Sequence, residues 1–146
     1  MTRDRDQFLD KARIAVVGAT DNKRKFGYTI YRTLKAKGFE VVPVNPNTDT
    51  VDSDRAFHRL TDIETDIQAA IIVVKPEHAL EVVDDAKAKG IKRLWFQRGA
   101  DFSESEQRAR QAGIDTVSGK CILMYAKPVD GIHAAHRFLV RLFGSL

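Results

Sequence analysis

The sequence contains one cysteine, Cys121, among its 146 residues. An internal disulfide and a metal site built from paired cysteines are therefore excluded, and this composition is typical of a reducing compartment. No apolar run approaches the roughly 18 uninterrupted residues of a membrane helix, and residues 1–13 are too charged for a secretory signal. We therefore expect a cytoplasmic protein that does not associate with a membrane.

The chain is long enough for one hydrophobic core, and we expect a single domain over residues 1–146, with residues 1–12 as an extension or a helix. Its formal net charge of +4 is unevenly distributed: residues 1–38 carry ten Lys or Arg against four acids, and residues 39–119 carry ten against fifteen. A nucleic-acid binder more often spreads cations along a face and intersperses aromatic residues among them. The local excess favours a small anion over nucleic acid, although a solvated basic helix would have the same composition.

Short apolar runs alternate along the chain with segments of helical periodicity. The runs have the length and continuity of strands buried on both faces, and they lie at residues 13–18, 39–44, 69–74 and 93–97, with a weaker one at 115–118. The helical segments are residues 26–37, 77–89 and 103–112. This alternation predicts an α/β, Rossmann-like doubly wound fold, in which a mostly parallel five-stranded sheet has helices on both faces.

The expected helices are bounded by recognisable signals. The residues that stand where the helices should end are Gly38, Gly90 and Gly113. At the start of the third helix, Ser103 with Glu106 predicts a capping box. The segment between residues 45 and 67 is rich in loop-forming residues, with a turn of helix expected at residues 56–60.

In a doubly wound sheet, ligands bind beyond the carboxyl ends of the strands, and the first strand-to-helix turn usually meets a phosphate. The stretches that this rule selects are residues 18–27, 44–47, 74–76 and 96–99. NAD requires the pattern G-x-G-x-x-G and an acid after the second strand. Here no glycine separates Gly18 from Gly27, and the residue after the second strand is Asn45. The Walker A pattern of triphosphate-binding loops is also absent from the sequence.

What remains is a longer turn that can hold a diphosphate. Suitable donors are the backbone N–H groups of Ala19 and Thr20, the Thr20 hydroxyl and the free amides of the following helix. Lys23, Arg24 and Lys25 add positive charge for an anion richer in phosphate than NAD. Coenzyme A is such an anion, with a diphosphate and a separate ribose 3′-phosphate.

The chain also resembles the small stand-alone CoA-binding proteins, which are related to the CoA-binding domain of the succinyl-CoA synthetase alpha subunit. Their opening segment resembles residues 16–47, VVGATDNKRKFGYTIYRTLKAKGFEVVPVNPN. The resemblance continues through residues 51–63, 94–114 and 121–144, so it covers nearly the whole chain. Its most specific elements are VPVNP at residues 42–46 and WFQRG at residues 95–99, in that order.

The resemblance implies which residues would contact CoA or an acyl-CoA at the carboxyl edge of the sheet. The first turn would hold the diphosphate, with Lys25 as the favoured cation. The loops after the second and third strands would border the adenosine, and the loop after the fourth would line the pantetheine path. The implied residues are Gly18, Ala19, Thr20, Lys25, Phe26 and Tyr28 for the diphosphate; Asn45, Pro46, Val74, Lys75 and Pro76 for the adenosine; and Phe96, Gln97 and Arg98 for the pantetheine.

Several of these residues also have a structural interpretation. Trp95 and Phe96 are most simply core residues of a buried strand, and the simpler interpretation of Pro43 and Pro46 is that they end a strand. Lys75 is either a phosphate contact or a solvated charge. The Gln97 amide needs a polar partner, because an unpaired buried polar group costs about 1 to 3 kcal/mol. A ligand or a neighbouring loop could supply that partner.

The sequence shows no evident catalytic machinery, so a binding protein is favoured over an enzyme. The chemistry of succinyl-CoA synthetase needs a phosphorylated histidine held in a further domain, and His58 and His78 are expected to face solvent. His133 and His136 lie three residues apart in the last expected helix, where with Cys121 they could form a metal site. A structural role for this pair is favoured, and no metal is expected.

Three alternatives to a simple CoA-binding protein stay open. The chain could supply the CoA site to a separate catalytic subunit of an acyl-CoA ligase or transferase. It could bind CoA through a mixed disulfide at Cys121, although a free cysteine is most often an inert, buried small hydrophobe. It could instead sense ADP or a dinucleotide through the shared adenosine diphosphate portion. The apolar last helix, residues 130–144, also permits a homodimer.

Overall fold

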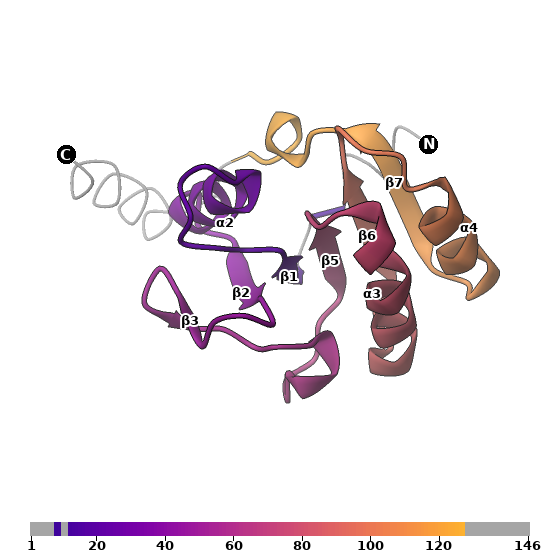
Figure 1. The fold of residues 1–146 in the computed structure, drawn as a ribbon, viewed down its shortest axis with the longest axis horizontal. Helices are drawn as coiled ribbons and strands as arrows, with labels where there is room; N and C mark the ends of the chain where they lie inside the picture. The colour runs from indigo at the N-terminus through magenta and orange to yellow at the C-terminus, as the bar shows by residue number, and fades with distance from the viewer. Residues whose placement is uncertain (1–7, 10–11, 128–146) are drawn as a thin grey trace.

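The computed structural model describes residues 8–9 and 12–127 (Figure 1). Within them, five parallel strands form one sheet in the spatial order β2-β1-β5-β6-β7. The strands are β1 (Arg13–Val17), β2 (Glu40–Val44), β5 (Ala69–Ile72), β6 (Arg93–Gln97) and β7 (Asp115–Lys120). The predicted Rossmann-like α/β fold is confirmed, and each strand lies at one of the apolar runs.

Helices cover both faces of the sheet (Figure 1). They are α2 (Phe26–Ala36) on one face, and α3 (Pro76–Lys89) and α4 (Ser103–Gln111) on the other. Because successive strand residues point to opposite faces, β1 directs Ile14 and Val16 toward α2, and Ala15 and Val17 toward α3 and α4. All four side chains are at most 5% exposed, so the sheet is buried on both sides, as continuous apolar runs predict.

The strand order reverses beside β1. The chain passes from β1 to β2 on one side and then crosses to β5 on the other side of β1. The loops that follow β1 and β5 therefore lead to helices on opposite faces of the sheet. This reversal point is where sheets of this kind bind their ligands.

The helix ends agree with their glycine signals, but the predicted capping box is wrong. The helices are followed by three glycines with positive φ, namely Gly38, Gly90 and Gly113. Ser103 is the first residue of α4, and the Asp101 carboxylate accepts a hydrogen bond from its backbone N–H (3.0 Å) and another from its hydroxyl. Glu106 contacts Arg110 and Thr116 instead of reaching back to the helix start.

The segment between β2 and β5 contains an antiparallel hairpin that the sequence pattern did not predict. Its strands are β3 (Thr50–Val51) and β4 (Asp54–Arg55). The two-residue loop, Asp52 and Ser53, has φ values of 51° and 66°, as in type I′ loops, which usually contain glycine or asparagine. Because this loop contains neither residue, the strongest hairpin signal is missing from the sequence.

Phe57 extends the edge of the sheet after the hairpin. Its backbone N–H donates to the Pro43 carbonyl (3.0 Å), and its carbonyl accepts from the Asn45 N–H (2.8 Å). Together these bonds form a parallel bridge with Val44. The helical turn expected at residues 56–60 is therefore wrong, because this backbone pairs with β2, and the 3-10 helix η1 (Leu60–Asp62) begins only afterwards.

Trp95 is a core residue, as the simpler interpretation of the sequence predicts. Its side chain has no solvent-exposed surface, and its ring centroid lies 5.3 Å from those of both Phe8 and Tyr125. The indole N–H donates to the Lys120 carbonyl at 2.9 Å. The one polar group of this side chain is thus satisfied within the protein.

Two further expectations concern a membrane span and the last expected helix. None of the helices in the described ranges is long and apolar enough to cross a membrane. The last expected helix, residues 130–144, lies outside the described residues. The interpretations of His133 and His136 and of a homodimer face on that helix therefore stay predictions.

Candidate functional site

The turn after β1 brings three elements into direct backbone contact. Gly18 has a φ of 100°, and a β-carbon added there would lie 2.3 Å from the carbonyl oxygen of Val73, just after β5. A β-carbon on Gly27, in the first turn of α2, would lie 2.0 Å from the Gly18 carbonyl oxygen. Neither distance is possible for a real side chain, so both positions require glycine. The start of α2 thus lies directly on the turn.

The start of α2 is uncapped. Lys25 occupies the N-cap position without a side-chain hydrogen bond to the helix, and the first turn of α2 contains no acid. The Thr20 hydroxyl and the Asn22 side chain instead stabilise the preceding turn, accepting hydrogen bonds from the backbone of Asn22 (3.1 Å) and Arg24 (3.0 Å). The start of α2 therefore has no side-chain cap that would compete with an anion, although the Tyr28 N–H already donates to the Lys25 carbonyl (3.1 Å).

The backbone donors of the turn differ in their accessibility. Ala19 is fully buried, and its N–H is directed to the Val16 carbonyl at 3.4 Å. The N–H groups of Thr20 and Asp21 make no hydrogen bond to any residue within 8–9 and 12–127. Thr20 and Asp21, and also Lys23, are thus the turn residues whose backbone N–H groups have no partner among the described residues.

The cations of the turn pair with no described residue. Lys23, Arg24 and Lys25 are exposed, and none of their side chains forms an ion pair or hydrogen bond with another described residue. The neighbouring acid, Asp21, is instead paired with Arg32 at 2.6 Å. Uncompensated positive charge therefore lies at the amino-terminal end of α2, where the helix dipole is also positive.

Asn45 joins the loop after β2 to the turn after β1, which we call the glycine turn (residues 18–25). Its side-chain amide donates to the Ala19 carbonyl (2.9 Å), and its side-chain oxygen accepts from the Asn47 N–H (2.8 Å). Pro46, beside it, is exposed. Both residues therefore adjoin the first turn, and their contact with an adenosine stays a prediction.

The loop after β5 adjoins the same turn. A Val74 methyl carbon lies 3.2 Å from the position that a β-carbon on Gly18 would occupy. Lys75 is the N-cap residue of α3, and Pro76 is its first residue. Lys75 is exposed and pairs with no acid in the part of the chain that the structure describes, so both interpretations of its charge stay open.

Gln97, the last residue of β6, is the predicted site residue whose polar partner the sequence left open between a ligand and a neighbouring loop. The Gln97 amide donates to the Cys121 sulfur (3.0 Å), and its oxygen accepts from the Ile122 N–H (3.1 Å). The neighbouring loop therefore supplies its partners. The Phe96 side chain is fully buried in the core, whereas Arg98 is exposed.

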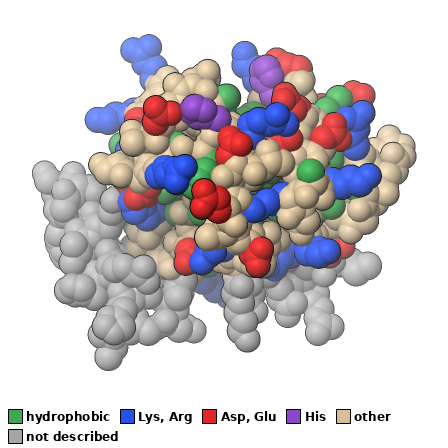
Figure 2. Space-filling view, turned by 90° about the horizontal axis from the view of Figure 1, so that it is seen from below, with side chains coloured by type: hydrophobic (Ala, Val, Ile, Leu, Met, Phe, Trp, Pro, Cys, Tyr) green, Lys and Arg blue, Asp and Glu red, His purple; other side chains and the backbone are tan. Residues whose placement is uncertain are grey.

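The cysteine and the described histidines are not grouped into a reactive centre. Cys121 is free and only 8% exposed, which favours its interpretation as an inert small hydrophobe. His58 and His78 are exposed, as predicted, and histidine side chains lie among charged groups on the face drawn in Figure 2. Within the described residues, no three His, Cys, Asp or Glu side chains are grouped to hold a metal ion.

Three ionisable groups in the described part of the chain have shifted pKa values with clear causes. The Ser103 hydroxyl and backbone N–H lower the pKa of Asp101, close to the loop after β6. Hydrogen bonding and charge from Glu40 raise the pKa of Arg13, and the carboxylate of Asp85 raises that of Arg59 in the same way. The two arginine pairs join neighbouring elements, β1 to β2 and the start of η1 to α3, so their role is structural.

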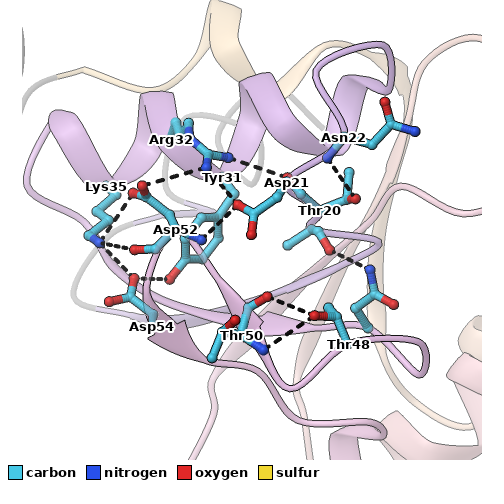
Figure 3. Close-up of polar contacts among 12 residues, drawn as sticks. Thr20, Asp21, Asn22, Tyr31, Arg32, Lys35, Thr48, Thr50, Asp52 and Asp54 are labelled. Atoms are coloured by element: carbon cyan, nitrogen blue, oxygen red, sulfur yellow. Dashed lines mark hydrogen bonds and ion pairs between the residues drawn. The ribbon is translucent and has the colours of Figure 1, made fainter. Parts of the chain in front are cut away.

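A charged network beside the turn after β1 was not predicted from the sequence (Figure 3). Arg32 pairs with Asp21 at 2.6 Å and lies 3.6 Å from Asp52. Lys35 pairs with Asp52 at 3.3 Å and with Asp54 at 2.7 Å. The three-residue spacing of the cations places them on one helix face, but spacing alone could not identify partners in an unpredicted hairpin.

The comparisons with known proteins agree on one family. A family model described as a CoA binding domain matches residues 12–127. An ADP-forming acetate–CoA ligase II from Archaeoglobus fulgidus is 37% identical over 107 residues, and the alpha subunit of such a ligase from Pyrococcus furiosus is 32% identical over 107 residues. These matches cover 72% and 73% of this chain but 16% and 23% of the two relatives. The chain therefore spans less than a quarter of the length of these ligases.

Similar proteins also include some of comparable length. A hypothetical protein from Pyrococcus horikoshii has a TM-score of 0.81 at 28% identity, covering 86% of this chain and 89% of that one. A dinucleotide-forming acetyl-coenzyme A synthetase from Candidatus Korarchaeum cryptofilum, solved with phosphate and ADP, has a TM-score of 0.69 at 27% identity. That match covers 77% of this chain and 26% of the synthetase chain. The likeness thus extends to small proteins and to one segment of larger enzymes.

Proposed function

Because the chain belongs to the CoA binding domain family, we propose that it binds coenzyme A or an acyl-CoA at the carboxyl edge of its sheet. In this proposal the diphosphate contacts the turn after β1. The chain itself holds the coenzyme, and any catalysis would need groups from elsewhere.

The uncapped start of α2 is the observation that carries the proposal. One turn carries the open N–H groups of Thr20 and Asp21 and helix amides without a side-chain cap. At residues 23–25 it also carries three cations that pair with no described residue. A diphosphate satisfies these donors and offsets the positive charge together. A further 3′-phosphate would use more of that charge, which favours CoA over ADP.

The other loops of the edge would hold the rest of the coenzyme. Asn45 and Pro46 would border the adenosine on one side and residues 74–76 on the other, because both loops adjoin the glycine turn. The pantetheine would pass the loop after β6, where Arg98 is exposed. Since the Phe96 ring is buried, this contact would involve the backbone of the loop and not the ring.

Isothermal titration calorimetry with CoA, dephospho-CoA, ADP and NAD tests the proposal. We expect CoA to bind most tightly and removal of its 3′-phosphate to weaken binding about tenfold, the value of one charge-assisted contact. Lys25→Gln should weaken CoA binding severalfold. The matched control Lys87→Gln removes a lysine that is also exposed, from the last turn of α3, and should not change CoA affinity. Tighter binding of NAD than of CoA, or no binding of CoA, would contradict the proposal.

A second candidate function is the supply of the CoA site to a separate catalytic subunit. The observation that favours it is the match to a short segment of ADP-forming acyl-CoA ligases, including an alpha subunit. Affinity purification of the tagged protein from its native host, followed by mass spectrometry, distinguishes the two functions. A stoichiometric second polypeptide would support the subunit role, whereas isolation of this chain alone with bound CoA would support a stand-alone binding protein.

A further inference from the structure

Arg32 connects the glycine turn, α2 and the hairpin (Figure 3). Its guanidinium donates to the Asp21 carboxylate at 2.6 Å and to the Thr20 carbonyl oxygen at 3.3 Å. It also lies 3.6 Å from a carboxylate oxygen of Asp52. The Tyr28 ring stacks against the guanidinium, with 3.9 Å between its centroid and the guanidinium carbon. These contacts hold the side chain in one orientation between the three segments.

The bond to the Thr20 carbonyl fixes the orientation of one peptide unit. In a trans peptide, the carbonyl of one residue and the N–H of the next point in opposite directions, and the described residues include no cis peptide. With the Thr20 carbonyl turned toward Arg32, the N–H of Asp21 is directed away from Arg32. That N–H has no partner among the described residues, so the contact leaves an open donor on the turn.

Arg32 also compensates a charge that would otherwise oppose an anion. An unpaired carboxylate on this turn would repel a phosphate bound beside it. The Asp21 carboxylate is paired with Arg32, and it accepts a further hydrogen bond from the backbone N–H of Asp52 at 2.8 Å. Its negative charge is therefore held on the side of the hairpin.

We propose that Arg32 is a positioning residue of the phosphate turn, which orients the Thr20–Asp21 peptide so that the Asp21 N–H donates to a diphosphate oxygen of the ligand. This inference rests on the proposed function. Arg32 acts through the turn and does not itself contact the phosphate, unlike the exposed cations at residues 23–25, which supply charge. Its effect should therefore be the same for every ligand that contains an adenosine diphosphate.

Lys35 provides a matched control for Arg32. It lies on the same face of α2, and it also pairs with the hairpin, at 3.3 Å from Asp52 and 2.7 Å from Asp54. The two cationic side chains are similarly exposed, 23% for Arg32 and 31% for Lys35. Among the described residues, only Arg32 of the two bonds to the turn. Loss of Lys35 thus removes direct bonds to the hairpin only, whereas loss of Arg32 also removes the direct bonds to the turn.

The test compares Arg32→Gln, Arg32→Lys and Lys35→Gln with the wild type by calorimetry with ADP, dephospho-CoA and CoA. Arg32→Gln should weaken binding of all three ligands by a common factor of about ten, because the diphosphate is common to them. Arg32→Lys should also weaken all three, since one ammonium cannot reproduce the guanidinium fork that bonds both Thr20 and Asp21. Lys35→Gln should bind all three ligands as the wild type does.

Amide hydrogen exchange without ligand supplies a second readout. The N–H groups of Asn22 and Arg24 are bonded within the turn at 3.1 Å and 3.0 Å, so release of the turn exposes them to exchange. We expect faster exchange at these two amides in both Arg32 variants and no change in Lys35→Gln. A variant that was only less stable would instead exchange faster throughout the sheet.

The outcomes separate this inference from the proposed function. If the wild type binds CoA and the Arg32 variants bind all three ligands equally well, the inference is overturned and the proposed function stands. An equal loss of affinity in Lys35→Gln would also overturn it, because hairpin docking would then explain the effect. If the wild type binds none of the ligands, the proposed function fails, and this inference fails with it. Should Arg32→Gln not fold, Arg32→Lys decides by the same criteria.

Discussion

Gly27→Ala should destabilise the protein, although alanine is the better helix former by about 1 kcal/mol. The new β-carbon would lie 2.0 Å from the Gly18 carbonyl oxygen, whereas ordinary contacts begin at 3.4 Å. This oxygen belongs to the backbone and cannot rotate away as a flexible side chain could. The start of α2 must therefore retreat from the turn, which also disturbs the packing of Ile30 and Leu34 on the sheet.

The expected loss follows from these two opposing effects. Overpacking of a close contact costs about 1 to 3 kcal/mol and occasionally more. Because the contact is between backbone atoms, we expect a cost at or above the upper end of this range, about 3 to 5 kcal/mol. The free energy of unfolding should therefore fall by about 2 to 4 kcal/mol after the gain of about 1 kcal/mol in helix propensity. In a chain of this length, such a loss lowers the melting temperature by roughly 6 to 15 °C.

Urea unfolding followed by circular dichroism measures this change. Gly90→Ala is a suitable control, because a β-carbon there meets no atom within 4 Å and only its φ of 83° is unfavourable. That control should lose about 1 to 2 kcal/mol, the cost of a left-handed conformation. If Gly27→Ala were as stable as the wild type or more stable, this would refute the close backbone contact between the start of α2 and the turn after β1.

Three further outcomes can be measured. Folded Cys121 should form no adduct with CoA disulfide, because it is only 8% exposed, whereas Gln97→Ala should release the loop at Cys121 and Ile122 and permit an adduct. Intact mass spectrometry, with Cys121→Ser as the control, measures this. An adduct on the folded wild type would contradict the expectation. Because Ser103 lowers the pKa of Asp101, the stabilisation from Asp101 should be complete above its unfolded-state pKa and disappear as the pH falls through its folded-state pKa. Melting curves across that acid range should therefore converge for the wild type and Asp101→Asn, and parallel pH dependences would count against this. CoA affinity should decrease with salt, since the cations at residues 23–25 are exposed and screened; calorimetry at low and high salt checks this.

The regular elements of the fold could be predicted because their signals are local. The strand β5 is a continuous apolar segment with every residue buried, and α3 begins with Pro76 and ends at Gly90, the residues that favour those positions. The hairpin could not be predicted, because Asp52 and Ser53 adopt left-handed backbone conformations without the glycine that usually marks them. Tertiary contacts with α2 stabilise that loop.

The candidate site could likewise be predicted only in part. The rule that parallel strands present their carboxyl ends at one edge predicted that Asn45 and Val74 would adjoin the turn at Gly18, and the structure places them there. The hydrogen-bond partner of Gln97 could not be predicted, because the pairing of β7 with β6 brings Cys121 to it from 24 residues away in the sequence. The role of Arg32 likewise depends on the docked hairpin and has no local signal.

The pairing of Phe57 with β2 has a consequence for association between molecules. β2 lies at the edge of the sheet, and an exposed edge is a template on which a strand of another molecule can add. Next to the candidate site, Phe57 already occupies the Pro43 carbonyl and the Asn45 N–H, and Pro43 itself has no N–H to offer. The segment after the hairpin therefore protects this end of β2 against edge-to-edge aggregation while the adjacent loops stay open to solvent.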